Sequence, residues 1–291
     1  MKRLLFLLLC TLLCLPAGTL SAQDGAMPSR WAVVNVSTSN LRLRPDYESS
    51  NESQALMGTV VQVLDADRYW RKVSTPEPYV AWTNDLALAY MSEEEKDSYL
   101  AAPKWICTED WVQILLPDGK NAWVKAAYLA DFETWTASRT ANGEALAAAA
   151  CRYNGVPYVW GGMSPHGFDC SGLVRFAYFQ CGILLPRNAR EQVLCGEAVP
   201  VRTEAMLPGD LVFYGTPARG RSPLKITHVA MYIGDGRIIH ASQRVRICSL
   251  SEDGPDPYTR QILAVRRILG HVDSGEGAVS LAASPWYFGG K

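Results

Sequence analysis

Surplus charge of either sign is absent from this sequence. Its 291 residues carry 28 Lys and Arg against 29 Asp and Glu, and no run of five like charges occurs. Nucleic acid is bound mainly through basic surfaces that neutralise phosphates, so we expect no nucleic-acid partner. The balance also argues against a charged interaction tail. The composition is that of an ordinary globular protein.

A long hydrophobic run is also missing, apart from a short one at the N-terminus. Leu4–Leu15 is apolar over twelve residues, whereas a spanning helix needs about 20. Lys2 and Arg3 precede it, and Ala22 ends a small-residue cleavage motif. This order is typical of a secretory signal peptide, which we place at residues 1–22. We expect export across the inner membrane to the periplasm, with no membrane span.

Cysteine pairs at zinc-binding spacing are absent as well. Eight cysteines occur, two of them in the signal peptide, and no C-x2-C pair is formed. A domain of this size does not need disulfides to fold. If one thiol is reserved for chemistry, five of the mature cysteines remain, and we predict that most are small buried hydrophobic side chains.

The first half of the mature sequence is rich in strand patterns. From Trp31 to about Leu88, short apolar segments alternate with turn residues, which predicts a small all-β barrel. Ser92, followed by three glutamates, predicts the start of a helix. Several short strands follow between Trp105 and Val124, a segment that is short for a second barrel.

The second half changes pattern near Thr134. Helices come first, at Glu144–Tyr153 and Ser171–Gln180, and antiparallel strands follow, so the fold class predicted here is α+β. The Gly- and Ser-rich tail after His271 is expected to be loosely held. The domains predicted are a signal peptide (1–22), a first β domain (23–88), a helical linker with a truncated β segment (89–131), a catalytic domain (132–271) and a tail (272–291).

The sharpest local motif surrounds Cys170, in the stretch Gly167–Val174. The cysteine stands where a glycine-containing loop meets an apolar helix. Unpaired amides and the helix dipole at such an end favour a thiolate, so we expect a lowered pKa for this thiol. The neighbouring amides could also bind an oxyanion. A core cysteine that merely begins a helix remains the alternative on this motif alone.

A second feature is a pair of histidines in one predicted hairpin, His228 and His240. A three-residue loop, or a bulge with the same effect, would pair His228 with Ser242 and put His240 diagonally beside it on the same face. A simple two-residue loop would place the two rings on opposite faces. In the first arrangement, His228 could act as a base that His240 orients. Two unrelated strand histidines, or a metal pair, are the alternatives.

With these residues identified, the segment from about Thr140 to Leu269 resembles the NlpC/P60 family of papain-like bacterial cell-wall cysteine peptidases. The ordered stretches that carry the resemblance are Tyr158–Gly162, Phe168–Gly172, Leu185–Asn188, Gln192, Pro208–Phe213, His228–Gly234 and Ile239–Ala241. The resemblance implies a catalytic triad of Cys170, His228 and His240, and a reaction that needs no metal or organic cofactor.

The upstream β segments resemble bacterial SH3 modules. Such modules ahead of this catalytic domain are similar to those of the YkfC-type γ-D-glutamyl-L-diamino acid endopeptidases, which cut muropeptides that have a free N-terminal L-Ala. This likeness implies that Glu52 and Tyr79 contact that L-Ala. It also implies substrate contacts for Tyr158 and Trp160 before the nucleophile, and for Asp169 and Ser171 on either side of it. The alternative for the aromatic residues is core packing.

Two departures from the family pattern concern specificity. The second SH3-like segment is short, and Ala189 stands where some relatives have Ser. The function predicted is hydrolysis of the γ-D-Glu–diamino acid bond in a muropeptide by a monomer. An amidase or acyltransferase with the same triad, and a cell-wall-binding module without activity, are the alternatives.

Overall fold

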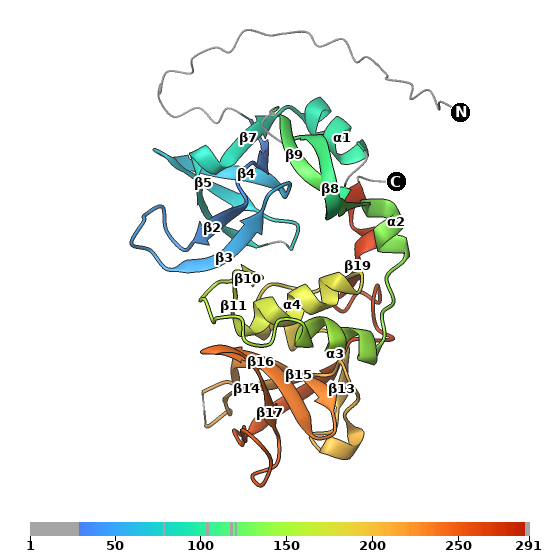
Figure 1. Ribbon diagram of the computed structural model, residues 1–291. Helices are drawn as coiled ribbons and strands as arrows, with labels where there is room; N and C mark the ends of the chain where they lie inside the picture. The colour runs from blue at the N-terminus through green and yellow to red at the C-terminus, as the bar shows by residue number, and fades with distance from the viewer. Residues whose placement is uncertain are drawn as a thin grey trace, which may run out of the picture.

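The computed structural model describes residues 29–77, 79–102, 105–116, 119, 121–220 and 222–288. The predicted signal peptide lies outside these ranges. An N-terminal β region and a helix–hairpin segment lie at one end of the molecule, and a layer of helices over a large sheet forms the other end (Figure 1). Among the described residues, no helix has the length and apolar character needed to cross a membrane.

The N-terminal β region is a seven-stranded antiparallel sheet in the order β3-β2-β6-β5-β4-β1-β7. Alternate apolar residues form its core: in β4, Val61 and Val63 are buried while Gln62 between them is partly exposed. The strand-like patterns at residues 31–36, 40–44, 58–64, 69–73 and 79–82 predict five of the seven strands, whereas β3 and β7 were not predicted. The strands are β1 (Trp31–Val34), β2 (Thr38–Arg42), β3 (Asn51–Leu56), β4 (Val60–Asp67), β5 (Trp70–Ser74), β6 (Val80–Asn84) and β7 (Leu88–Met91).

The helix predicted at Ser92 is α1, Glu93–Ala101. Ser92 caps it, because its hydroxyl accepts from the Glu95 amide at 3.1 Å and the Glu95 carboxylate accepts from the Ser92 amide at 2.7 Å. Beyond it, β8 (Trp105–Leu115) and β9 (Asn121–Asp131) form one long antiparallel hairpin. The prediction of several short strands here was therefore wrong in number, since two long strands pair throughout.

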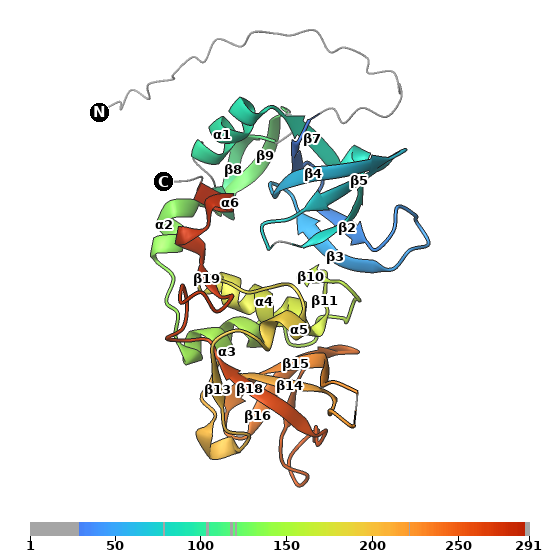
Figure 2. The same ribbon diagram turned by 180° about the vertical axis from the view of Figure 1, so that it is seen from behind.

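The C-terminal half is α+β, as predicted. Its six antiparallel strands run in the order β13-β18-β14-β15-β16-β17, with α3 and α4 packed on one face (Figure 2). The elements are α2 (Phe132–Ala137), α3 (Gly143–Cys151), β10 (Met163–Ser164), β11 (Gly167–Phe168), α4 (Cys170–Gln180), β12 (Ile183–Leu184), α5 (Ala189–Gln192), β13 (Glu197–Val199), β14 (Leu211–Thr216), β15 (Lys225–Gly234), β16 (Arg237–Ser242), β17 (Arg244–Ser249) and β18 (Ile262–Arg267).

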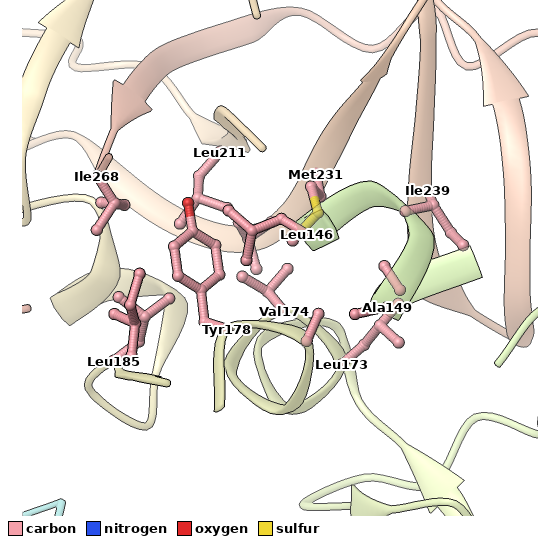
Figure 3. Close-up of a cluster of buried hydrophobic side chains, with 14 of the residues drawn as sticks. Leu146, Ala149, Leu173, Val174, Tyr178, Leu185, Leu211, Met231, Ile239 and Ile268 are labelled. Atoms are coloured by element: carbon pink, nitrogen blue, oxygen red, sulfur yellow. The ribbon is translucent and has the colours of Figure 1, made fainter. Parts of the chain in front are cut away.

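The main core lies between α4 and this sheet. Leu173, Val174 and Tyr178 project from one side of α4 into the core, where Met231 of β15 also packs (Figure 3). The Tyr178 hydroxyl donates to the carbonyl of Gly209 at 2.9 Å, so this buried hydroxyl has a partner. The packing fixes α4 against β15, and with it the helix end that carries Cys170.

The C-terminal segment is packed, in contrast to the loosely held tail that we predicted. β19 (Val279–Ser280) pairs with β12, and η3 (Leu281–Ala283) and α6 (Pro285–Phe288) follow. Leu281 is fully buried, and the ring of Phe288 stacks 5.4 Å from that of Phe132 in α2. Apolar side chains placed late in the segment overcome its glycine-rich composition.

Candidate active site

Cys170 is the first residue of α4, at the helix end that the sequence predicted. Asp169 is the N-cap, and its carboxylate accepts from the Gly172 amide at 2.7 Å. The amides of Ser171 and Val229 donate towards the Cys170 sulfur. Because Val229 directly follows His228 in β15, the thiol lies beside the strand that carries the predicted base.

The two histidines meet as predicted. His228 Nε2 lies 2.8 Å from His240 Nδ1, and the rings meet edge to face with their centroids 5.0 Å apart. The hairpin turn itself is a two-residue one, with positive φ at Asp235 and Gly236. A bulge between Tyr232 and Gly234 shifts the register of β15 against β16, which puts both rings on one face. Of the two arrangements that we expected, the bulge is the one that brings the two rings together.

The expected lowering of the thiol pKa is wrong for this structure. Burial and the nearby Asp169 carboxylate raise the pKa of Cys170 to about 11, although the Val229 and Ser171 amides act in the opposite direction. Burial lowers the pKa of His228 to about 4 and that of His240 to about 3. The thiol of Cys170 and the imidazoles of His228 and His240 are therefore neutral at neutral pH.

Aromatic rings that sequence reasoning missed enclose the histidines. The ring of Tyr258 lies 4.4 Å from that of His240, and the ring of Tyr214 lies 5.9 Å from that of His228. Tyr258 comes from the loop between β17 and β18, and no local motif marks it. These rings contribute to the burial that is the largest cause of the low pKa values of the two imidazoles.

Tyr158 and Trp160 lie in the loop before Cys170. Burial, and then the charge that Cys170 would carry as a thiolate, raise the pKa of Tyr158 to about 12. The phenol therefore keeps its proton near the thiol and is available as a donor. The side chain of Trp160 is 63% exposed, so it is not a core aromatic residue. Both positions are compatible with contacts to a substrate.

Asp169 and Ser171 are buried in a network whose centre, Arg187, sequence reasoning did not assign to the site. Arg187 is 1% exposed, and its Nη2 lies 2.6 Å from Asp169 Oδ2. Its Nη1 donates to the Ser171 hydroxyl at 3.0 Å. The only signal in the sequence was its place in the Leu185–Asn188 stretch. Asp169 and Ser171 thus shape the site in this structure, and their contact with substrate stays a prediction.

Strand β3 brings the N-terminal region to the same site. Ser53 accepts from Arg187 Nε at 2.8 Å, the Gln54 side-chain oxygen accepts from the Met163 amide at 3.1 Å, and Asn51 donates to the carbonyl of Trp160 at 3.2 Å. These contacts explain why β3 is polar. Because it is polar, the sequence pattern did not predict it as a strand. Its polar side chains contact the segments on either side of Cys170 in the chain.

Glu52 and Tyr79 lie at this junction. The Glu52 carbonyl accepts from Arg187 Nη2 at 3.3 Å, and its carboxylate accepts from the Ser50 hydroxyl at 2.6 Å. Burial, and then the Glu52 carboxylate, raise the pKa of Tyr79. Glu52 and Tyr79 are thus close enough to interact electrostatically, as a shared subsite requires.

Comparison with known proteins agrees with this geometry. Residues 155–264 match the sequence profile of the NlpC/P60 family. A γ-D-glutamyl-L-lysine dipeptidyl-peptidase of Bacillus cereus is 30% identical over 258 residues, which are 75% of each chain. The chain belongs to the NlpC/P60 family. This relationship confirms the expected class of enzyme, a cysteine peptidase of the NlpC/P60 type.

Two further relatives define the extent of the likeness. The crystal structure of an NlpC/P60 family protein from Bacillus cereus matches with a TM-score of 0.69 at 26% identity, over 82% of this chain and 99% of its own. The murein DD-endopeptidase MepH of Escherichia coli is 41% identical over 120 residues, 40% of this chain and 42% of its own. The first match extends over the N-terminal β region as well as the NlpC/P60 domain.

Proposed function

We propose that this protein hydrolyses the bond between γ-D-Glu and a diamino acid in muropeptides that have a free N-terminal L-Ala. The observation that carries the proposal is the paired imidazoles, 2.8 Å apart, on the two strands against which α4 packs, the helix that begins at Cys170. Such a set is what nucleophilic catalysis requires: a nucleophile, a base and a group that orients the base. The name of the Bacillus cereus relative supports the choice of bond.

The reaction follows from the protonation states. Cys170 attacks the γ-D-Glu carbonyl while His228 takes the thiol proton, because neither group is ionised at rest. The amides at the start of α4 stabilise the oxyanion. His228 then returns the proton to the amine of the leaving diamino acid. Water hydrolyses the remaining thioester, with His228 again as base, and His240 holds the ring in place throughout.

The requirement for a free amine rests on the junction with β3. Asp169 already accepts from Arg187, from the Ser171 hydroxyl and from the Gly161 and Gly172 amides. Glu52 can therefore supply the charge that pairs with an α-ammonium, with Tyr79 beside it. Trp160 would pack on the substrate and Tyr158 would donate near the reacting carbonyl. An endopeptidase of this type acts on released peptides, which suits the proposed export to the periplasm.

The experiment compares wild type with Cys170→Ala on L-Ala-γ-D-Glu-meso-diaminopimelate. Wild type is expected to release diaminopimelate, and the variant to lose at least about a thousandfold in turnover, since no other group can form the thioester. Cys181→Ala, which changes the cysteine that caps the C-terminal end of the same helix, serves as control and should keep its activity. Turnover retained by Cys170→Ala would contradict the proposal.

A further inference from the structure

A second polar chain begins on the far side of His240. Cys248 Sγ, from β17, lies 3.4 Å from His240 Nε2. Its thiol donates to Asp256 Oδ2, 3.5 Å away in the loop after β17. Arg246 Nη1 lies 3.2 Å from both oxygens of Asp256. Three side chains, Cys248, Asp256 and Arg246, thus connect the paired histidines to the molecular surface.

Burial makes the direction of each hydrogen bond in this chain consequential. His240 is 0% exposed and Cys248 is 1% exposed, and the ring of Tyr258 covers the imidazole. In such a dry environment, a ring N–H without an acceptor is destabilising. The protons in the chain are therefore arranged so that each donor faces an acceptor.

The surface end of the chain fixes that arrangement. The Asp256 carboxylate, paired with Arg246, has no proton to give, so it can only accept. Burial raises the pKa of Cys248 to about 11, which keeps a proton on the thiol for donation to Asp256. The sulfur then offers only lone pairs to His240, so His240 Nε2 must donate to it.

The same reasoning fixes the position of the proton on each imidazole in turn. Burial keeps His240 neutral, with a pKa of about 3, so a proton on Nε2 leaves its Nδ1 as an acceptor. His228 Nε2 must then donate to His240 Nδ1 across the 2.8 Å contact. His228 is neutral as well, so its Nδ1 carries no proton and is the atom left to receive one from Cys170.

We propose that Cys248 and Asp256 are positioning residues that set the tautomer of the base, with the direction of the chain defined by the Asp256 carboxylate. This inference rests on the proposed function, in which His228 takes the proton of Cys170. It assigns a defined role to a cysteine that sequence analysis treated as a small hydrophobic side chain. The reverse direction would put a proton on His228 Nδ1 and prevent it from acting as a base.

Three variants at two positions test the chain. Cys248→Ala removes both hydrogen bonds of the sulfur, whereas Cys248→Ser keeps a donor and an acceptor. Asp256 is half exposed, so Asp256→Asn should leave the fold intact. The asparagine offers N–H groups where only an acceptor was present. Cys195→Ala is the matched control, since Cys195 is equally buried and its thiol donates to the Glu191 carbonyl, outside this chain.

The measurements are the nitrogen NMR signals of His228 in the resting enzyme and turnover of the L-Ala-γ-D-Glu-diaminopimelate peptide. In wild type, His228 Nδ1 should be pyridine-like. In Cys248→Ala and Asp256→Asn, the Nδ1 signal should move towards the protonated form. We expect kcat to fall roughly tenfold with KM little changed, the size of one lost hydrogen bond in the transition state.

The inference would be supported if Cys248→Ser recovered both the wild-type Nδ1 signal and the wild-type kcat, and if Cys195→Ala behaved like wild type. A pyridine-like Nδ1 in both disruptive variants would overturn it, even if kcat fell, because the loss would then be structural. A pyrrole-like Nδ1 in wild type would overturn it as well. The NMR readout needs no turnover, so failure of wild type to cleave the peptide would count against the proposed function alone.

Discussion

At Cys170 two opposing physical effects decide the protonation state of the thiol at rest. The start of α4 favours a thiolate through its dipole and free amides, whereas burial and the Asp169 carboxylate favour the thiol. Burial dominates, and the pKa rises to about 11. Sequence reasoning found the helix end because its signals are local. It missed the desolvation because the covering groups come from segments distant along the chain.

The first prediction follows from this raised pKa. The thiolate fraction of a group with a pKa of about 11 is small at neutral pH and grows as pH rises, so alkylation of Cys170 by iodoacetamide should accelerate about tenfold per pH unit between roughly pH 7 and 10. Mass spectrometry of the Cys170 peptide measures the rate. A small-molecule thiol of ordinary pKa is the control and should level off near pH 9. A rate independent of pH from 5 to 8 would indicate a preformed ion pair and contradict this.

At the scale of the elements, β15, β16 and α4 converge on one point. The two strands could be paired from the sequence, because the spacing between His228 and His240 leaves few registers in which the rings meet. The sequence left two options for the feature that brings the rings together, and the structure has one of them, a bulge beside a two-residue turn. The place of Arg187 in the site could not be predicted from the sequence, because its partners Asp169, Ser171 and Ser53 are far apart along the chain.

The Arg187–Asp169 pair gives the second prediction. Arg187→Met should lower the free energy of unfolding by about 3 kcal/mol, because a buried carboxylate at the cap of α4 would lose its counter-charge. Denaturant unfolding measures the change. Arg190→Met is the control, since the Arg190 side chain is 72% exposed and its ion pair contributes little. Equal stability of the two variants would show that the pair does not stabilise the fold.

At the scale of the whole molecule, contacts from both ends of the chain hold the catalytic half to the N-terminal region. Strand β3 contacts the loop that precedes Cys170, and Arg175 of α4 pairs with Glu77. The C-terminal segment contributes Trp286, whose ring lies 6.0 Å from that of Trp31 in β1. Composition alone predicted a loose tail, because a few apolar anchors among glycines leave no periodic pattern.

The C-terminal segment gives the third prediction. Leu281→Ala should lower the free energy of unfolding by about 3 kcal/mol, because Leu281 is fully buried and the change leaves a cavity against Phe132 and Leu184. Val279→Ala, at a side chain that is 44% exposed, should change stability little. Thermal or denaturant unfolding of both variants decides the point. A loosely held tail would make the two variants alike.

The most direct test of the central claim compares L-Ala-γ-D-Glu-meso-diaminopimelate with the same peptide N-acetylated on L-Ala. The account predicts cleavage of the free-amine peptide alone, with Glu52→Gln weakening that cleavage by raising KM. Glu48→Gln, at an exposed position nearby in sequence, should behave as wild type. Equal cleavage of both peptides would contradict the proposed subsite, although the assignment as a cysteine peptidase would stand. Cleavage of neither would contradict the proposed function and favour an amidase, an acyltransferase or a cell-wall-binding role.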